Sequence, residues 1–242
     1  MSTNNLLTLE GVHTHIGAYH ILHGVDLAVP RGQLTMLLGR NGAGKTTTLR
    51  TIMGLWHASQ GRVRFGDRDI TAMHTPQIAE LGIAYVPENM GIFSDLTVKE
   101  NMLLAARSAK NAQQIDDTRL KWIFKLFPAV EKFWNHPAGK LSGGQKQMLA
   151  VSRAIVEPRE LLLIDEPSKG LAPVMINNMI DAFAELKASG VTILLVEQNI
   201  NFAQRLGDNV AVMDNGRVVH SGSMAAFSAD AQLQQSLLGL AL

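Results

Sequence analysis

The feature that most constrains the fold is a glycine-rich loop between an apolar segment and a helical one. Residues 39–46 are Gly-Arg-Asn-Gly-Ala-Gly-Lys-Thr, and they directly follow the apolar run 34–38. The glycines allow backbone N–H groups to converge on phosphate oxygens beside a helix N-terminus, and Lys45 adds a cation for the outer phosphates. A plain turn between strand and helix would explain neither Lys45 nor Thr46, whose hydroxyl can ligate Mg²⁺. The sequence therefore predicts a nucleotide phosphate site.

A second motif ends a buried strand with two acidic residues. The apolar run 161–164 is followed by Asp165 and Glu166, at the strand edge where open α/β sheets bind ligands. Asp165 suits a magnesium shell, while Glu166 can orient or deprotonate a water that attacks the γ-phosphate. A solvated acidic turn is the alternative interpretation, and the glycine loop elsewhere in the chain weighs against it.

A third motif is Leu-Ser-Gly-Gly-Gln at 141–145. Ser142 and Gln145 predict a capping box that opens a helix, and the two glycines leave its first turn almost bare of side chains. Phosphate oxygens can approach such N–H groups closely. A single fold does not obviously reach the γ-phosphate from two such places, so the motif suggests donation to ATP on another subunit.

Composition and charge narrow the class of protein. The chain has 242 residues, of which 46% are hydrophobic and 18% charged, so we expect one domain with a substantial core. A net charge of +1 gives no electrostatic footprint for nucleic acid. Cysteine is absent, which excludes disulfides and fits a reducing compartment. No apolar run approaches the ~18 residues of a membrane span, so we expect a cytoplasmic protein that reaches a membrane only through partners.

The order of predicted elements indicates an α/β fold with one helical interruption. Apolar or alternating segments predict strands at 6–12, 25–29, 34–38, 63–65, 83–86, 161–164, 191–196, 210–213 and 218–219, and helices at 45–53, 75–81, 142–156 and 173–189. Residues 97–134 have a helical pattern instead, which starts at a capping box of Thr97 and Glu100. We expect an α-helical subdomain inserted at about 93–141 within a single domain spanning 1–242.

In chain order, the motifs are the glycine loop, Leu-Ser-Gly-Gly-Gln and the strand that ends in Asp165 and Glu166, and together they resemble those of ATP-binding cassette (ABC) ATPases over almost the whole chain. The resemblance implies a P-loop NTPase (RecA-like) core with an N-terminal antiparallel β subdomain and an inserted α-helical subdomain, with ATP and Mg²⁺ as cofactors. It also implies a head-to-tail dimer that holds two ATPs between each phosphate loop and the other subunit's signature helix. The implied nucleotide-binding residues are Gly39, Arg40, Asn41, Gly42, Ala43, Gly44, Lys45, Thr46, Thr47, Ser142, Gly143, Gly144 and Gln145. The implied Mg²⁺ ligands are Thr46, Glu88 and Asp165, and the implied catalytic residues are Glu166 and Gln198.

Finer motifs resemble one branch of that family. Val-Pro-Glu at 86–88, Glu-Pro-Ser-Lys-Gly-Leu-Ala-Pro at 166–173 and Val-Glu-Gln-Asn at 196–199 are similar to LivF-type subunits of branched-chain amino acid importers. This implies an ATPase that energises amino-acid uptake on the cytoplasmic face of the inner or plasma membrane. The implied partners are a second ABC ATPase subunit, in a hetero- or homodimer, transmembrane permease subunits and, indirectly, a solute-binding protein, but no nucleic acid.

Other functions stay open at this point. The transported solute could be urea, an amide or a lipid-type molecule, and the chain could be a regulatory nucleotide-binding subunit with low turnover. A soluble ABC ATPase of translation or DNA maintenance is disfavoured, because such proteins usually contain tandem cassettes or long coiled-coil insertions.

Three positions depart from the commonest ABC pattern. Ile16 stands where many relatives have an aromatic residue that stacks on adenine, and Tyr19 is the nearby candidate to replace it. Glu88 replaces a glutamine, and its carboxylate can ligate Mg²⁺ but cannot donate an N–H. Gln198 replaces a histidine at the γ-phosphate, and it keeps a donor while losing a titratable charge.

Three further groups have two interpretations each. His13 and His15 would share one face of a strand, as metal ligands or as ordinary surface residues. Met90, Ile92 and Phe93 could line a groove for a membrane subunit or belong to the helical core. Residues 168–172 correspond to a family loop at the dimer interface, and could equally form a surface turn.

Overall fold

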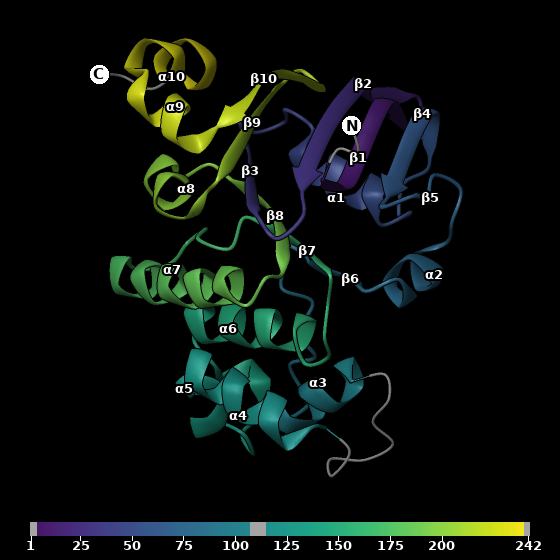
Figure 1. Cartoon of the computed structure of the whole chain (residues 1–242). Coiled ribbons are helices and arrows are strands. Elements are labelled where there is room, and N and C mark those ends of the chain that lie inside the picture. The colour runs from purple at the N-terminus through teal and green to yellow at the C-terminus, as the bar shows by residue number, and fades with distance from the viewer. Residues whose placement is uncertain (1–3, 107–114, 240–242) are drawn as a thin grey trace.

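Buried apolar strands form the centre of the molecule (Figure 1). The computed structural model describes residues 4–106 and 115–239. A six-stranded sheet has the order β10-β9-β3-β8-β7-β6, in which β3, β6, β7, β8 and β9 are parallel and β10 is antiparallel to β9. Its strands are β3 (Leu34–Gly39), β6 (Ile83–Val86), β7 (Leu161–Asp165), β8 (Thr192–Glu197), β9 (Asn209–Asp214) and β10 (Arg217–Ser223). Parallel strands covered on both faces are expected to be continuously apolar, and β3, β7 and β8 are buried along their whole length.

A second, antiparallel sheet is formed mainly by the first part of the chain. Its order is β2-β1-β4-β5, with the strands β1 (Asn5–Ile16), β2 (Tyr19–Pro30), β4 (Ala58–Phe65) and β5 (Arg68–Asp69). Alternate residues of β1 and β2 are buried, as expected for a sheet with one face against the core. Leu9 pairs with Leu27 in β2 and with Val63 in β4, so the three strands present one apolar face.

The helices cover both faces of the parallel sheet and extend to either end of the molecule (Figure 1). They are α1 (Lys45–Ile52), α2 (Thr75–Glu80), α3 (Val98–Ala105), α4 (Asp117–Leu126), α5 (Pro128–Lys132), the 3₁₀ turn η2 (Ala138–Lys140), α6 (Gly143–Ala154), α7 (Pro173–Ala188), α8 (Ile200–Leu206), α9 (Met224–Ala229) and α10 (Ala231–Leu238). The part of the expected helical region at 107–114 lies outside the described residues. Within residues 4–106 and 115–239, no helix is long and apolar enough to cross a lipid bilayer.

The parallel sheet separates two buried apolar clusters. Met36 and Leu38 of β3 belong to the cluster packed on α6, α7 and the helices after β6, whereas Leu37 belongs to the cluster that contains α1 and the antiparallel sheet. In β7, Leu162 and Leu163 divide in the same way. The predicted fold class, an α/β core with an N-terminal antiparallel sheet and helices between β6 and β7, is therefore confirmed.

Candidate functional site

The glycine-rich loop connects β3 to α1, and its shape depends on residues without side chains. Gly39, Gly42 and Gly44 have φ values of 150°, 81° and 103°, which favour glycine. A Cβ on Gly39 would lie 2.3 Å from the carbonyl oxygen of Met213. Lys45 begins α1 and is only 5% exposed, because Nζ turns back to donate to Gly39 O at 2.9 Å. The loop therefore surrounds a buried ammonium group.

The turn between β9 and β10 braces this loop. Gly216 N donates to Ala43 O at 3.0 Å, and His23 N of β2 donates to Gly216 O at 2.8 Å. A Cβ on Gly216 would lie 2.0 Å from Ile21 O. The turn thus holds the glycine loop from one side and the antiparallel sheet from the other.

Asp165, at the end of β7, is fully buried beside the first turn of α1. Thr46 Oγ1 donates to Asp165 Oδ1 at 3.1 Å, and Tyr85 donates its hydroxyl to Oδ2 at 3.3 Å. Burial raises the pKa of Asp165, and the Thr46 hydroxyl partly opposes that shift. Burial also raises the pKa of Tyr85 to about 12, so its hydroxyl stays protonated and able to donate.

Glu166 is the most constrained carboxylate of the site. Its φ of 47° is unusual for a residue with a side chain, and its amide donates to Val196 O at 3.0 Å. Gln198 Nε2 donates to Glu166 Oε1 at 2.5 Å, and Lys45 Nζ lies 3.6 Å from the same oxygen. The structure thus brings three sequence-predicted residues from three separate segments into contact.

A cavity of about 350 Å³ lies over the glycine loop and α1. It is lined by Ile21, Asn41, Gly42, Ala43, Gly44, Lys45, Thr46, Thr47, Glu88, Glu166 and Lys169. A second cavity of about 350 Å³ is lined by Leu38, Gly39, Arg40, Asn41, Glu197, Gln198 and Leu238. Between them, the two cavities are lined by every residue predicted from the loop itself, together with Glu88, Glu166 and Gln198.

The residues predicted to hold Mg²⁺ fit that ion. The Thr46 hydroxyl lines the cavity, and it is hydrogen-bonded to the carboxylate of Asp165, so two oxygen ligands lie side by side. Mg²⁺ prefers oxygen ligands and is usually bound by one or two carboxylates together with substrate phosphates and water. Glu88 contributes a third oxygen donor, although its carboxylate forms an ion pair with Lys169 at 2.6 Å.

The Leu-Ser-Gly-Gly-Gln segment is remote from these cavities. Its predicted capping box is confirmed, since Ser142 N donates to Gln145 Oε1 at 2.9 Å and Gln145 N donates to Ser142 Oγ at 3.4 Å. A Cβ on Gly144 would lie 2.6 Å from the terminal methyl of Met175, whereas nothing lies within 4 Å of one on Gly143. Neither cavity is lined by residues 142–145. A side chain on Gly144 would thus have to displace the flexible end of Met175 on α7, whereas the Gly143 side is open.

Glu197 lines the second cavity, although it was not among the predicted site residues. Its carboxylate is only 2% exposed and accepts from Ser168 N at 2.9 Å, Gln198 N at 3.0 Å and Asn199 N at 3.1 Å. Burial raises the pKa of Glu197, and the hydrogen bonds oppose that shift. The signal available in the sequence was an acidic residue that ends an apolar strand.

Two other residues near the phosphate loop were missed. Lys169 lines the cavity and forms ion pairs with both Glu88 and Glu166. Ile21 lines the cavity from β2. A lysine inside the loop that follows the acidic pair was a visible signal for the first, whereas an isoleucine in a strand gave none for the second.

Tyr19 lies at the start of β2 and is 75% exposed. It lines neither cavity. The nearby histidines contact one another. The His20 ring stacks on that of His15 at 4.1 Å and lies tilted against that of His23 at 4.0 Å. Among the described residues, no group of three His, Cys, Asp or Glu side chains is arranged to hold a metal ion, so the metal interpretation of His13 and His15 is not supported.

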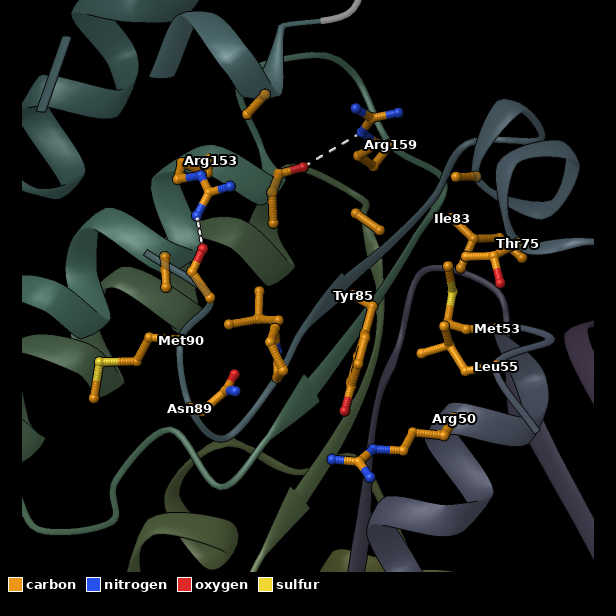
Figure 2. A pocket seen from close by; sticks show the side chains of 18 of the residues that line it. Arg50, Met53, Leu55, Thr75, Ile83, Tyr85, Asn89, Met90, Arg153 and Arg159 are labelled. Atoms are coloured by element: carbon orange, nitrogen blue, oxygen red, sulfur yellow. Dashed lines mark hydrogen bonds between the residues drawn. The ribbon is translucent and has the colours of Figure 1, made fainter. Parts of the chain in front are cut away.

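A larger cavity of about 740 Å³ opens between α1, β6 and α6 (Figure 2). Its wall combines apolar and cationic side chains, among them Arg50, Met53, Leu55, Tyr85, Met90 and Arg153. Arg153 Nη1 donates to Gly91 O at 2.5 Å, which fixes the segment after β6 against α6. The three apolar residues that could line a groove or belong to the helical core are divided between these places. Met90 lines this cavity, and Met90 and Ile92 also pack against the core cluster. Phe93 is 50% exposed and lies with its ring 5.2 Å from the Arg153 guanidinium.

A phosphate loop that leads from a parallel strand into a helix, beside acidic residues that end a neighbouring strand, defines the class of P-loop nucleoside triphosphatases. Comparison with known proteins narrows the class. Residues 22–169 match the family model described as ABC transporter. The chain belongs to this family, and it is an ATP-binding subunit that hydrolyses ATP.

Individual relatives agree with that assignment. The chain is 37% identical to the high-affinity branched-chain amino acid transport ATP-binding protein BraG of Pseudomonas aeruginosa, over 97% of this chain and 100% of the relative. It is 36% identical to the probable branched-chain amino acid transport ATP-binding protein LivF of Archaeoglobus fulgidus, over 84% of this chain and 86% of the relative. An ATP-binding cassette of an ABC transporter in its ADP conformation superposes with a TM-score of 0.82 at 26% identity, covering 98% of this chain and 99% of that one.

Proposed function

We propose that this protein energises the uptake of branched-chain or other amino acids through separate membrane subunits of an ABC importer. The proposal is supported by the similarity to BraG, a branched-chain amino acid transport ATP-binding protein that aligns with this chain over its full length. We further propose that residues 1–242 act as one nucleotide-binding domain, in which 93–141 form a helical subdomain. Transport of urea, an amide or a lipid-type solute is the alternative to be tested.

The arrangement at the glycine loop supports a mechanism for hydrolysis. The loop amides and Lys45 bind the phosphates of ATP, and Mg²⁺, held by Thr46, Asp165 and Glu88, would neutralise charge on the β- and γ-phosphates. Glu166 orients the attacking water and accepts its proton. The bond from Gln198 Nε2 to Glu166 Oε1, at 2.5 Å, is the observation that best supports a shared catalytic role for these two residues.

The separation of residues 142–145 from the phosphate cavities supports a dimer. In this proposal the first turn of α6 donates its N–H groups to ATP held by a second ABC ATPase subunit. The open Gly143 face permits close approach of a phosphate. That second subunit is a copy of this chain in a homodimer, or a related ATPase subunit in a heterodimer.

The cavity in Figure 2 supports contact with a permease. Its apolar side chains, including Met53, Leu55 and Met90, suit the apolar face of a short helix from a membrane subunit. We propose that this contact, rather than a membrane span, holds the protein on the cytoplasmic face of the membrane. A solute-binding protein on the other side would act on it only through the permease.

Reconstitution of the protein with its permease and a second ATPase subunit in liposomes tests this function. ATP inside the liposomes is expected to drive uptake of radiolabelled leucine when the solute-binding protein is supplied outside. Uptake of urea or an amide but not of any amino acid would contradict the proposed substrate class. Gln198 also favours a regulatory subunit with low turnover, and that role would be supported if Glu166→Gln left the hydrolysis and uptake of the complex unchanged.

A further inference from the structure

A lysine in the loop after β7 brings a second ammonium group to the edge of the phosphate cavity. Lys169 Nζ lies 2.6 Å from Glu88 Oε1 and 3.6 Å from Glu166 Oε2. All three residues line the cavity over the glycine loop. Since Lys45 Nζ lies 3.6 Å from Glu166 Oε1, the carboxylate of Glu166 has a cation beside each of its oxygens.

The backbone that carries Lys169 is held in a defined turn. Lys169 N donates to Glu166 O at 3.2 Å, and Leu171 N donates to Ser168 O at 3.2 Å. Glu166 and Gly170, on either side, both have left-handed φ values, 47° and 71°. The side chain itself is 58% exposed, so its ammonium group extends from a fixed base and is accessible to a ligand.

The partner of Lys169 is the residue that departs from the usual glutamine. A glutamine amide offers both an acceptor and a donor, whereas the carboxylate of Glu88 only accepts. The ion pair restores both functions at this place, with Glu88 as acceptor and the Lys169 ammonium as donor. A lysine ammonium group is cationic at neutral pH, so it can donate to an anionic oxygen.

We propose that Lys169 binds the terminal phosphate of ATP held on its own subunit, and that its ion pair with Glu88 supplies the N–H donor that a glutamine at position 88 would bring. The inference rests on the proposed ATP site. When ATP enters, the ammonium group exchanges its longer contact with Glu166 for a γ-phosphate oxygen and keeps its shorter contact with Glu88. ADP lacks that phosphate, so Lys169 discriminates ATP from ADP.

Titration of the full-length, isolated subunit with a fluorescent non-hydrolysable ATP analogue, and in parallel with fluorescent ADP, tests this. Lys169→Met is expected to weaken binding of the ATP analogue by about five-fold, the upper range for a solvent-exposed charge contact, and to leave ADP binding unchanged. Lys169→Arg, which keeps the charge, should retain most of the affinity. Equal affinities of Lys169→Met and wild type for the ATP analogue, or an equal loss for both nucleotides, would overturn the proposal.

The matched control is Lys125→Met. Lys125 forms an ion pair with Glu185 at 3.0 Å and is 71% exposed, but it belongs to α4 and lines neither phosphate cavity. Lys125→Met should leave the affinities for the ATP analogue and for ADP unchanged.

Lys45→Met distinguishes a failure of the proposed ATP site from a failure of the role given to Lys169, because it should weaken the binding of both nucleotides. If it has no effect, the proposed ATP site is wrong. If it weakens both nucleotides while Lys169→Met changes neither, only the role of Lys169 is wrong.

Glu88→Gln tests the pairing. In that background the amide supplies its own donor, so adding Lys169→Met should cost less ATP affinity than it does in the wild type. An undiminished loss in the double variant would show that Lys169 acts without Glu88. A loss that appears only after the second ATPase subunit is added would assign Lys169 to the partner's nucleotide, and this too overturns the proposal.

Discussion

At the scale of single residues, Glu166 combines a rare backbone conformation with a carboxylate that is already held in place. A non-glycine residue with positive φ costs roughly 1–3 kcal/mol and persists only when neighbouring contacts compensate. Here the compensation comes from the hydrogen bond that the Glu166 amide donates to Val196 O and from the contacts of the Glu166 side chain with Lys45 and Gln198. The conformation aims the carboxylate at the cavity over the glycine loop, where a terminal phosphate would lie.

Glu166→Gln is expected to preserve ATP binding and to lower the rate of hydrolysis by roughly 100-fold or more, because an amide cannot accept the proton of the attacking water. With the partner subunit present, the variant should accumulate as an ATP-bound closed dimer. Single-turnover hydrolysis and size-exclusion chromatography with ATP measure the two effects. Normal turnover in this variant would remove Glu166 from the catalytic role.

Tyr19→Ala addresses recognition of the base. Since 75% of Tyr19 is exposed at the start of β2, its ring is free to cover an adenine, and its removal should weaken ATP binding by about 1 kcal/mol. Calorimetric titration measures the change. Ile21→Ala is the comparison, because Ile21 lines the phosphate cavity. If affinity responds to Ile21 but not to Tyr19, the base is covered by the aliphatic side chain and Tyr19 is only structural.

At the scale of elements, the end of β8 holds two functional loops together. The buried Glu197 carboxylate accepts from Ser168 N in the loop after β7 and from Gln198 N and Asn199 N in the loop after β8. A shift of either loop must therefore change the hydrogen bonds of the other. This carboxylate therefore positions Gln198 by accepting a hydrogen bond from its backbone amide.

Glu197→Gln should fold but lose part of the connection between the two loops. The substitution replaces one carboxylate oxygen with an amide nitrogen, which cannot accept a hydrogen bond from the backbone N–H groups that face it. Leaving a buried donor unpaired costs about 1–3 kcal/mol, which corresponds to a fall of several °C in Tm for a chain of this size. Thermal denaturation measures the shift, and steady-state kinetics should show a lower kcat with a nearly unchanged KM. An unaltered Tm and kcat together would contradict the connecting role.

Long buried strands were predictable from the sequence, whereas the short helices after β8 were not. The runs 161–164 and 191–196 are apolar except for Thr192 because both of their faces are covered, and they match β7 and β8 within a residue or two. The helices α8, α9 and α10 contain six to eight residues each. They are preceded by Asn199, Ser223 and Asp230, whose side chains cap them. Helices of this length depend on tertiary packing, so the caps alone did not predict them.

The same division applies to the site. The glycine loop and the capping box at Ser142 are local motifs, so their geometry follows from residues close in sequence. The contact between Glu88 and Lys169 joins residues 81 positions apart, and it depends on how β6 and β7 pair and on the turn after Glu166. Spacing in the sequence contains no information about such a contact.

At the scale of the whole molecule, the two sets of nucleotide-binding motifs do not meet within one chain. The first turn of α6 packs on α7 through Gly144 and Met175 and leaves Gly143 open. Its position is therefore fixed by the fold, while its proposed ligand must come from another subunit. In the proposed dimer, binding of ATP and closure of the two subunits are therefore separable steps.

Ser142→Arg is expected to separate those steps. The arginine places a long side chain where the partner's ATP would approach and also removes the capping hydroxyl, so dimer closure should be blocked while the subunit's own ATP affinity changes little. Affinity is measured on the monomer and closure by light scattering with ATP. Ser142→Ala is the control that loses the cap alone, at a cost of about 1 kcal/mol. A loss of ATP affinity in the Ser142→Arg monomer would contradict the dimer proposal.

The turn between β9 and β10 has a practical consequence for engineering. The Asn215-Gly216 pair is a two-residue hairpin tip, the kind of place usually chosen to insert an epitope tag or a fluorescent reporter. Here the amide of Gly216 donates to Ala43 in the glycine loop, and its carbonyl accepts from His23 of β2. An insertion at this tip would pull on the phosphate loop directly, and a tagged protein could express and fold while failing to bind nucleotide.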